Sequence, residues 1–328
     1  MPPAGGRSAG ASGSAAEESS RLVTRRESEG PPHYDEGVTS TKILELGVRV
    51  HHLDEGEGRP VFVLVHGLGG SHLNWAPVVG ALALRGRVLV PDLAGFGRTA
   101  PGPEGSTVDA NLALLTRFIE AAVDGPVVLA GNSMGGYLSM RLAATRPDLV
   151  RGLVLVDPAA PMALGAGLDP KVVAMFAGFA VPGLATWLMR RRAAASGPEA
   201  AVRDMLRLCT VDLARVDPEV LDAHVDLARA RVAMPWVADA FLEAARSLLV
   251  ALARRPTYHA LVDTVRAPTL LVHGARDRLV PVQAARHLAA RRPDWQYEEH
   301  ADLGHVPQLE SPGWFLGVVE PWLDRLPA

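Results

Sequence analysis

The stretch VVLAGNSMGG, residues 127–136, decides the fold prediction. Its first half is a run of apolar residues typical of a buried strand. Its second half places Ser133 between two glycines, and a helix-compatible segment, 137–144, follows. Glycine tolerates the close backbone approach of a sharp turn between a strand and a helix. The pattern therefore predicts a tight turn that lifts the Ser133 hydroxyl clear of a sheet and places the Met134 N–H at a helix start.

A serine in such a turn is a candidate nucleophile, which needs a base and an acid that orients the base. Asp277 follows a short apolar strand pattern, 268–274, and His305 follows the last predicted strand, 295–299. Open α/β sheets bind their ligands at the carboxyl ends of their strands. We therefore expect Ser133, Asp277 and His305 to meet at that edge as nucleophile, acid and base.

Other side chains compete for these roles. The alternative interpretation of Asp277 is a solvated loop residue or the cap of the following helix, and Asp157, at the end of a strand, is an alternative acid. We expect Asp92 to shape a turn and His273 to be buried at a strand end. The remaining histidines without supporting context, each expected in a surface or core role, are His51, His52, His72 and His300.

Predicted strands alternate with helical segments through most of the chain. The strands before the alternative acid are expected at 42–53, 61–65, 88–91, 127–130 and 153–156. The first is expected to pair antiparallel with its neighbour as a hairpin. The later strands are nearly all apolar, which is typical of a parallel sheet buried on both faces. The pattern predicts the α/β class.

Composition fits one catalytic domain with an appendage. The chain has 328 residues, with 33 Lys and Arg against 36 Asp and Glu, so no basic surface for nucleic acid is expected. Cys209 is the only cysteine, which excludes an internal disulfide and a cysteine metal cluster, and we interpret it as a buried small apolar residue. No metal-site spacing or phosphate-binding loop is recognised, so no cofactor is expected.

Residues 1–41 are rich in Gly, Ser, Ala and Glu and hold few large apolar side chains. Such a segment buries too little apolar surface to offset the entropy of folding, so we predict a disordered tail. It lacks an apolar stretch of signal-peptide length. A cytoplasmic location is therefore expected.

More than a hundred residues separate Asp157 from Pro268, whereas an ordinary crossover needs about 20–30. We predict a helical cap at 160–237 inserted into a core made of 42–159 and 238–328, with 240–255 returning as the crossover helix. The run 172–189 has no charged residue, and three arginines follow it. Three interpretations stay open: two apolar cap helices facing a pocket, a lid that touches lipid, or a membrane span.

Together these landmarks resemble the α/β-hydrolase superfamily, from about residue 42 to the end. The matching pieces, in the family's order, are Val65-His66-Gly67, Pro91-Asp92-Leu93-Ala94-Gly95-Phe96-Gly97, the serine turn, Gly274 with Asp277, and Gly304-His305-Val306-Pro307 with Glu310 and Pro312. The resemblance implies a mostly parallel eight-stranded sheet flanked by helices. It also implies that the backbone N–H of Leu68 joins that of Met134 in an oxyanion hole, with His66 fixing the loop that carries Leu68.

The activity expected from these motifs is acyl transfer from a small to medium lipophilic ester to Ser133 and then to water. The residues around Ser133 are also similar to those of carbon–carbon bond hydrolases of ring-cleavage products. Those enzymes, however, tend to carry tryptophan where this chain has Val306. Thioester, lactone and amide hydrolysis, and a non-catalytic small-ligand receptor, remain alternatives. Asn74, Trp75 and Tyr137 are candidate substrate-lining residues, with core packing as the alternative for each. Oligomeric state is left open, and weak membrane-surface contact through the cap is a further possibility.

Overall fold

The structure is a computed structural model that describes residues 41–161, 170–179 and 183–327. These residues lie within one compact unit, Glu36–Ala328. The tail predicted over 1–41 falls, apart from Thr41, outside the described residues.

Eight strands form one sheet in the order β1-β2-β4-β3-β5-β6-β7-β8. Strand β2 pairs antiparallel with β1 and β4, and every other pair is parallel. The predicted mostly parallel eight-stranded sheet is confirmed. The strands are β1 Lys42–Glu45, β2 Arg49–Glu55, β3 Val61–Val65, β4 Arg87–Pro91, β5 Val127–Asn132, β6 Val150–Val156, β7 Thr269–Gly274 and β8 Gln296–His300.

The segment predicted as one strand, 42–53, is instead a hairpin of its own. Gly47 lies between β1 and β2 with φ of 76°, a conformation that glycine adopts without steric cost and that reverses the chain. Strand β2 then pairs with β4 rather than with β3, the strand next to it in sequence. The prediction of antiparallel pairing was right, but the partner was wrong.

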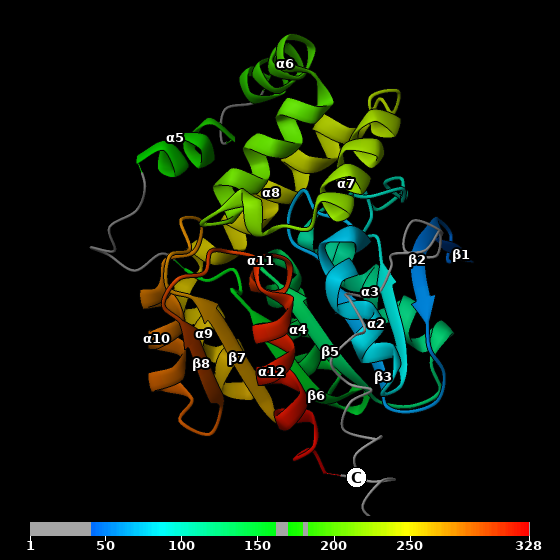
Figure 1. The fold of residues 1–328 in the computed structure, drawn as a ribbon, viewed down its shortest axis with the longest axis vertical. Coiled ribbons are helices and arrows are strands. Elements are labelled where there is room, and N and C mark those ends of the chain that lie inside the picture. The colour runs from blue at the N-terminus through cyan, green and yellow to red at the C-terminus, as the bar shows by residue number, and fades with distance from the viewer. Residues whose placement is uncertain (1–40, 162–169, 180–182, 328) are drawn as a thin grey trace, which may run out of the picture. The chain divides into compact units, whose positions relative to one another are not determined.

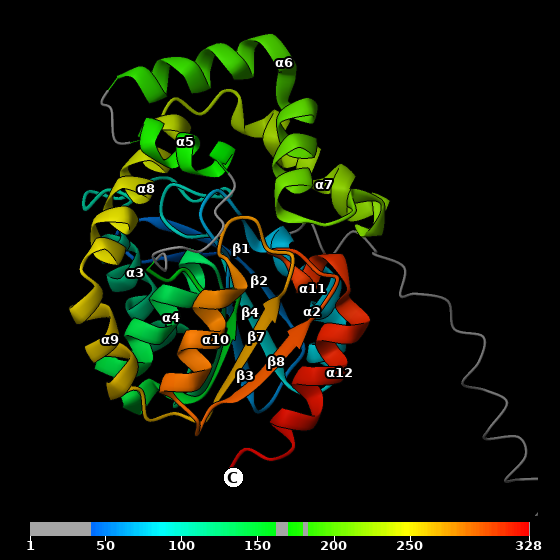
Figure 2. The ribbon, with the colours of Figure 1, turned by 90° about the vertical axis from the view of Figure 1, so that its left-hand side faces the viewer.

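Helices cover both faces of the sheet. Figure 2 shows α3, α4, α9 and α10 on one side and α2 and α12 on the other. Along β3, Val61, Val63 and Val65 join the core under the first group, whereas Phe62 and Leu64 join the core under the second. Burial of each such side chain stabilises the folded state by roughly 1.5–3 kcal/mol. The helices are α2 Ala76–Ala83, α3 Val108–Ala122, α4 Met134–Thr145, α9 Arg255–Thr264, α10 Val282–Arg291, α11 Pro307–Glu310 and α12 Pro312–Leu323.

A helical segment joins β6 to β7 and lies beyond the carboxyl ends of the strands (Figure 1). Helix α6 is broken at Gly197, where φ is 73° and ψ is 167° and Pro198 follows. The apolar run 172–189 is divided between α5 and α6, and residues 180–182 lie outside the described part. The segment holds α5 Pro170–Phe179, α6 Leu184–Cys209, α7 Pro218–Arg231 and α8 Val237–Ala253.

The crossover helix predicted at 240–255 is α8, and a second helix, α9, follows it before β7. The chain leaves the helical conformation at Arg254, where ψ is 62°, and α9 begins at Arg255 with Pro256 in its first turn. Helix α8 buries Ala244 and Leu248 in the sheet core and Leu242 in a cluster with α5. Helix α8 therefore packs against both the sheet core and the helical segment. The boundary at 237 between cap and core stays a prediction.

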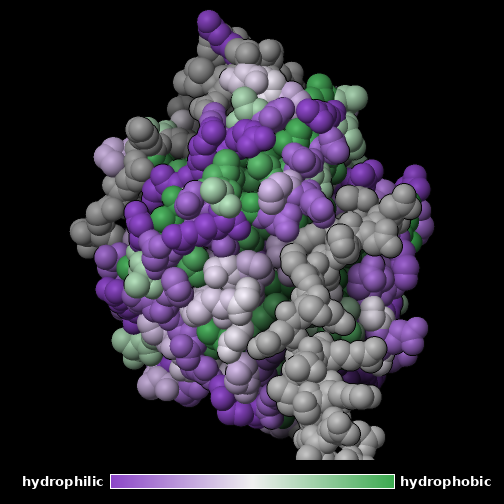
Figure 3. Space-filling view, viewed as in Figure 1, coloured by the Kyte–Doolittle hydropathy of each residue, from purple (hydrophilic) through white to green (hydrophobic). Residues whose placement is uncertain are grey.

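Within the described ranges, no helix combines the length and the apolarity needed to cross a membrane. On the face seen in Figure 3, apolar residues of the helical segment are interrupted by hydrophilic ones. Contact of this segment with a membrane surface stays a prediction.

Candidate active site

Ser133 stands at the junction of β5 and α4 in a strained conformation, with φ of 54° and ψ of −118°. Such a positive φ is unusual for a residue with a side chain, and strained residues of this kind cluster at functional sites. From Val127 to Met140, Ser133 is the only residue that is not buried. The predicted sharp turn with a presented hydroxyl is therefore present.

Glycines around this turn are required by contact. A Cβ on Gly131 would collide with the carbonyl oxygen of Gly135, and one on Gly135 would collide with the carbonyl oxygens of Val65 and His66. A Cβ on Gly67 would lie 3.0 Å from the Cβ of Ser133. The loop after β3 therefore lies directly against the serine.

Asp277 and His305 meet as the sequence predicted. The Nδ1–H of His305 donates to Oδ2 of Asp277 at 2.6 Å, and both side chains are buried. Oδ1 of Asp277 accepts the N–H groups of Leu279 and Val280, at 2.7 and 3.0 Å. Burial raises the pKa of Asp277, but the nearby His305 and its hydrogen bond outweigh burial, so the pKa lies below its ordinary value. A carboxylate thus fixes the tautomer of His305 and leaves Nε2 as the bare nitrogen.

Asn132 links the serine turn to the histidine loop. Its side-chain Nδ2 donates to the carbonyl oxygen of His305 at 2.9 Å and to that of Val156 at 3.1 Å. The backbone N–H of Ser133 also donates to Val156, at 3.0 Å. These three hydrogen bonds, donated by Asn132 and Ser133, hold the serine turn and the His305 loop in fixed positions relative to each other.

His66 is fully buried and has a structural role in the loop after β3, as expected. Its Nε2 accepts the N–H of Leu93 at 3.0 Å, so Nδ1 carries the proton and donates to Gly67 O at 2.8 Å. Burial lowers the pKa of His66 to about 4, so the ring is neutral at pH 7. Leu68 lies in the same loop, directly after Gly67, while Met134, the first residue of α4, has one of the N–H groups that a helix leaves without an intrahelical acceptor.

Asp92 shapes its turn, as predicted. It is fully buried and accepts the N–H of His72 at 2.8 Å, the Nδ1 of His72 at 2.9 Å and the N–H of Arg98 at 2.8 Å. Burial raises the pKa of Asp92, but the His72 ring and these donors lower it further than burial raises it. Asp92 and His72 therefore brace the loop that follows His66.

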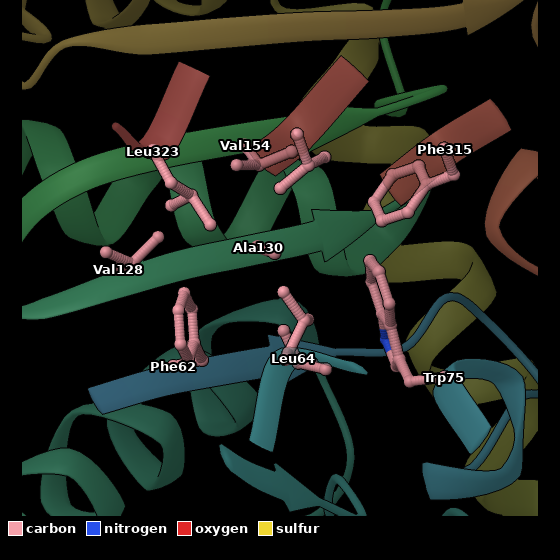
Figure 4. Close-up of a pocket in the computed structure, with 10 residues that line it drawn as sticks. Phe62, Leu64, Trp75, Val128, Ala130, Val154, Phe315 and Leu323 are labelled. Atoms are coloured by element: carbon pink, nitrogen blue, oxygen red, sulfur yellow. The ribbon is translucent and has the colours of Figure 1, made fainter. Parts of the chain in front are cut away.

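The three candidate lining residues have structural contacts. Oδ1 of Asn74 accepts the N–H of Ser71 at 2.8 Å in a capping box. Trp75 is fully buried and lines a small apolar cavity with Phe315 of α12, as Figure 4 shows. The ring of Tyr137 stacks on that of Tyr258, with centroids 6.0 Å apart. The contacts of Trp75 and Tyr137 correspond to the core-packing alternative, whereas Asn74 is half-buried and caps a helical turn.

Sequence reasoning missed the apolar cluster above the loop after β3. Phe179 of α5 and Phe241 of α8 meet edge to face, with ring centroids 5.4 Å apart, and Leu68 packs against them. A Cβ on Gly69 would lie 3.1 Å from the Phe241 ring. Phe179 and Phe241 are 62 residues apart in the sequence, and no hydrophobic periodicity predicts a contact over that separation.

Glu310 has a role that its motif did not reveal. Its Oε2 accepts the N–H of Gly304 at 2.8 Å, and its Oε1 accepts those of Val211 and Asp212 at 2.8 and 3.1 Å. The His305 N–H donates to the carbonyl oxygen of Cys209 at 2.6 Å. The end of α6 is therefore bonded directly to the histidine loop.

Asp157 and His273 complete the buried polar layer. Asp157 has φ of 43°, and its Oδ1 accepts the Gly274 N–H at 3.0 Å. His273 donates from Nε2 to Val280 O at 2.9 Å. Asp157, His273 and Asp277 each place a polar atom within 4.8 Å of the others, a grouping that no sequence spacing revealed.

Comparison with known proteins identifies the family. A profile described as alpha/beta hydrolase fold matches residues 60–312. The chain belongs to the α/β-hydrolase family. As a member of this family it is an enzyme, a hydrolase.

Relatives of this α/β-hydrolase carry several activities in their names. The pimeloyl-[acyl-carrier protein] methyl ester esterase of Aromatoleum aromaticum is 32% identical over 77% of this chain and 94% of its own length. The 2-hydroxy-6-oxo-6-(2'-aminophenyl)hexa-2,4-dienoic acid hydrolase of Metapseudomonas resinovorans is 28% identical over 85% of this chain and 89% of its own. A crystal structure of a putative lipase from Acinetobacter baumannii has a TM-score of 0.71 at 24% identity, covering 88% of this chain and 91% of that one, and shows the fold alone.

Proposed function

We propose that this α/β-hydrolase cleaves carboxylic esters of small to medium lipophilic substrates through an acyl-enzyme on Ser133. The observation that carries the proposal is the 2.6 Å hydrogen bond between Asp277 and His305, in a frame tied by Asn132 to the strained serine turn. A serine, an oriented imidazole and a carboxylate are the parts that nucleophilic acyl transfer requires.

In the proposed mechanism, the bare Nε2 of His305 takes the proton of the Ser133 hydroxyl as the oxygen attacks the ester carbonyl carbon. Asp277 stabilises the imidazolium that forms. The protonated imidazole then gives its proton to the leaving alcohol. A water molecule, activated by His305 in the same way, attacks the acyl-enzyme and releases the acid.

The negative oxygen formed during the attack would be bound by the backbone N–H groups of Leu68 and Met134. The start of α4 supplies a positive dipole end and the Met134 donor, while Gly67 brings the other loop against Ser133. Removal of one such donor typically costs about 3 kcal/mol of transition-state stabilisation.

The substrate class follows from the apolar cluster of Leu68, Phe179 and Phe241. These side chains come from α5, α8 and the loop that would bind the oxyanion, so an apolar group of the substrate would lie beside its carbonyl. A cap of this kind excludes water and selects substrates by shape. This is our reason for proposing lipophilic esters.

The test is labelling with an active-site-directed fluorophosphonate together with hydrolysis of short- and medium-chain nitrophenyl esters. Ser133→Ala should fold and lose both signals. The matched control is Ser139→Ala, because Ser139 lies in the helix that follows Ser133, is buried and has a hydroxyl with no hydrogen-bond partner among the described residues. Undiminished turnover by Ser133→Ala would refute the assignment of the nucleophile.

A second candidate, carbon–carbon bond hydrolysis of ring-cleavage products, is favoured by the relative from Metapseudomonas resinovorans. The same serine and histidine would serve it. Val306 stands where the carbon–carbon hydrolases that this chain resembles tend to carry tryptophan, which favours ester hydrolysis. The ratio of kcat/KM for a dienoate ring-cleavage product to that for nitrophenyl butyrate discriminates the two, and a ratio above one would favour the second candidate.

A further inference from the structure

A second buried carboxyl group, that of Asp157, lies close to Asp277, the proposed acid. Its side chain is fully buried at the end of β6, and its Oδ2 has no hydrogen-bond partner among the described residues. One oxygen of Asp157 lies within 4.8 Å of one oxygen of Asp277. Two ionised carboxylates this close, both out of water, repel each other strongly, so one of them should carry a proton.

Hydrogen bonding decides which carboxyl is ionised. Asp277 already accepts three hydrogen bonds, two on Oδ1 from backbone N–H groups and one on Oδ2 from His305. Asp157 accepts one, from Gly274, on Oδ1. The pKa of Asp157 is accordingly raised well above its ordinary value, first by burial and then by the charge of Asp277. The carboxylate is therefore Asp277.

The neighbouring groups do not supply a compensating charge to Asp157. His273 lies 3.5 Å from its Oδ1, but Nε2 of that ring donates to a backbone carbonyl, and burial lowers the pKa of His273 despite the charge of Asp277. The next charge that acts on Asp157 is that of Glu310, which is negative. A carboxylate has about four acceptor positions, so Asp277 has one left for a further donor.

We propose that Asp157 is protonated and that its O–H donates a hydrogen bond to Asp277, making Asp157 a positioning residue for the acid that orients His305. This inference rests on the proposed function for its effect on activity, but not for the protonation itself. The neutral acid would hold Asp277 in place and satisfy its last acceptor position, while the other oxygen keeps Gly274 in register with β6.

Asp157→Asn is the informative variant because an amide reproduces a protonated carboxyl. Its oxygen can accept from Gly274 and its N–H can donate to Asp277. Asp157→Gly removes both groups. Asparagine and glycine both accept the φ of 43° at this position, so backbone strain does not separate the two variants. We expect kcat of Asp157→Asn for a nitrophenyl ester within about twofold of wild type and a loss of about tenfold in Asp157→Gly, the value of one hydrogen bond.

Infrared difference spectra at pH 7 test protonation directly. Wild type minus Asp157→Asn should show the carbonyl stretch of a protonated carboxylic acid. Ser133→Ala should retain that band, so failure of the proposed nucleophile leaves this result unchanged. A difference spectrum with only carboxylate bands would overturn the proposal, as would a loss in Asp157→Asn equal to that in Asp157→Gly. A stoichiometric metal ion found by elemental analysis of the purified protein would overturn it too, because the same side chains would then bind metal.

Discussion

Replacement of Glu310 by glutamine tests whether one buried carboxylate ties the helical segment to the histidine loop. Glu310 accepts N–H groups from Val211, Asp212 and Gly304, and its side chain is completely buried. Glutamine keeps one acceptor oxygen and replaces the other with a donor, which would face an N–H. A hydrogen bond to a charged group is worth about 1.5–3 kcal/mol, and an unsatisfied buried donor costs about 1–3 kcal/mol. Allowing for the smaller cost of burying a neutral group, we expect Glu310→Gln to lose about 3 kcal/mol.

Urea unfolding measures that loss, and Asp302→Asn is the control. Asp302 lies in the same loop and pairs with Arg215 and Arg276, but its side chain is 47% exposed. Exposed ion pairs contribute about 0–1 kcal/mol, so the control should change little. We also expect kcat of Glu310→Gln to fall between about tenfold and a hundredfold, because the loop that carries His305 would shift. A stability change below about 0.5 kcal/mol would refute the reasoning.

Three further predictions concern the site and its supports. Asp277→Asn should lower kcat roughly 10⁴-fold, because the amide would leave His305 in the wrong tautomer. The circular dichroism spectrum should stay unchanged, and a loss of kcat below tenfold would contradict the assignment of Asp277 as the acid. Gly135→Ala should destabilise the protein by more than about 3 kcal/mol in thermal unfolding because its Cβ would strike backbone, whereas Gly313→Ala, with nothing within 4 Å, should not. Because the pKa of His66 is lowered to about 4, the unfolded state takes up a proton that the folded state does not as pH falls from about 6.5 to 4. The unfolding free energy should then fall by about 1.4 kcal/mol per pH unit for this group, and the slope in that window should be shallower in His66→Asn, measured by urea unfolding.

Local chemistry explains what was predictable. The positions of β3 and β5, the serine turn and the glycines around it follow from apolar runs and from steric rules that act within a few residues. The pairing of Asp277 with His305 was also predictable, because each side chain follows a strand whose carboxyl end reaches the same edge of the sheet. Those features do not depend on how distant side chains pack against one another.

Features that depend on distant contacts were not predictable. The pairing of β2 with β4 and the positions of Trp75 and Tyr137 in the core depend on which surfaces meet. The sequence could name Trp75 as a neighbour of the loop after β3, but not the side of the sheet to which its ring turns. Packing against Phe315 decides that.

The sequence by itself determined where the central strands lie along the chain, the strained serine turn and the residue types that chemistry at that serine would need, since these depend on near neighbours. Only the tertiary structure decided that Glu310 bonds the end of α6 to the histidine loop and that Asp157 lies beneath Asp277. The physical reason is that hydrogen bonds and charge repulsion act over a few ångströms. Partners 98 and 120 residues apart are therefore set by how the whole sheet is wound.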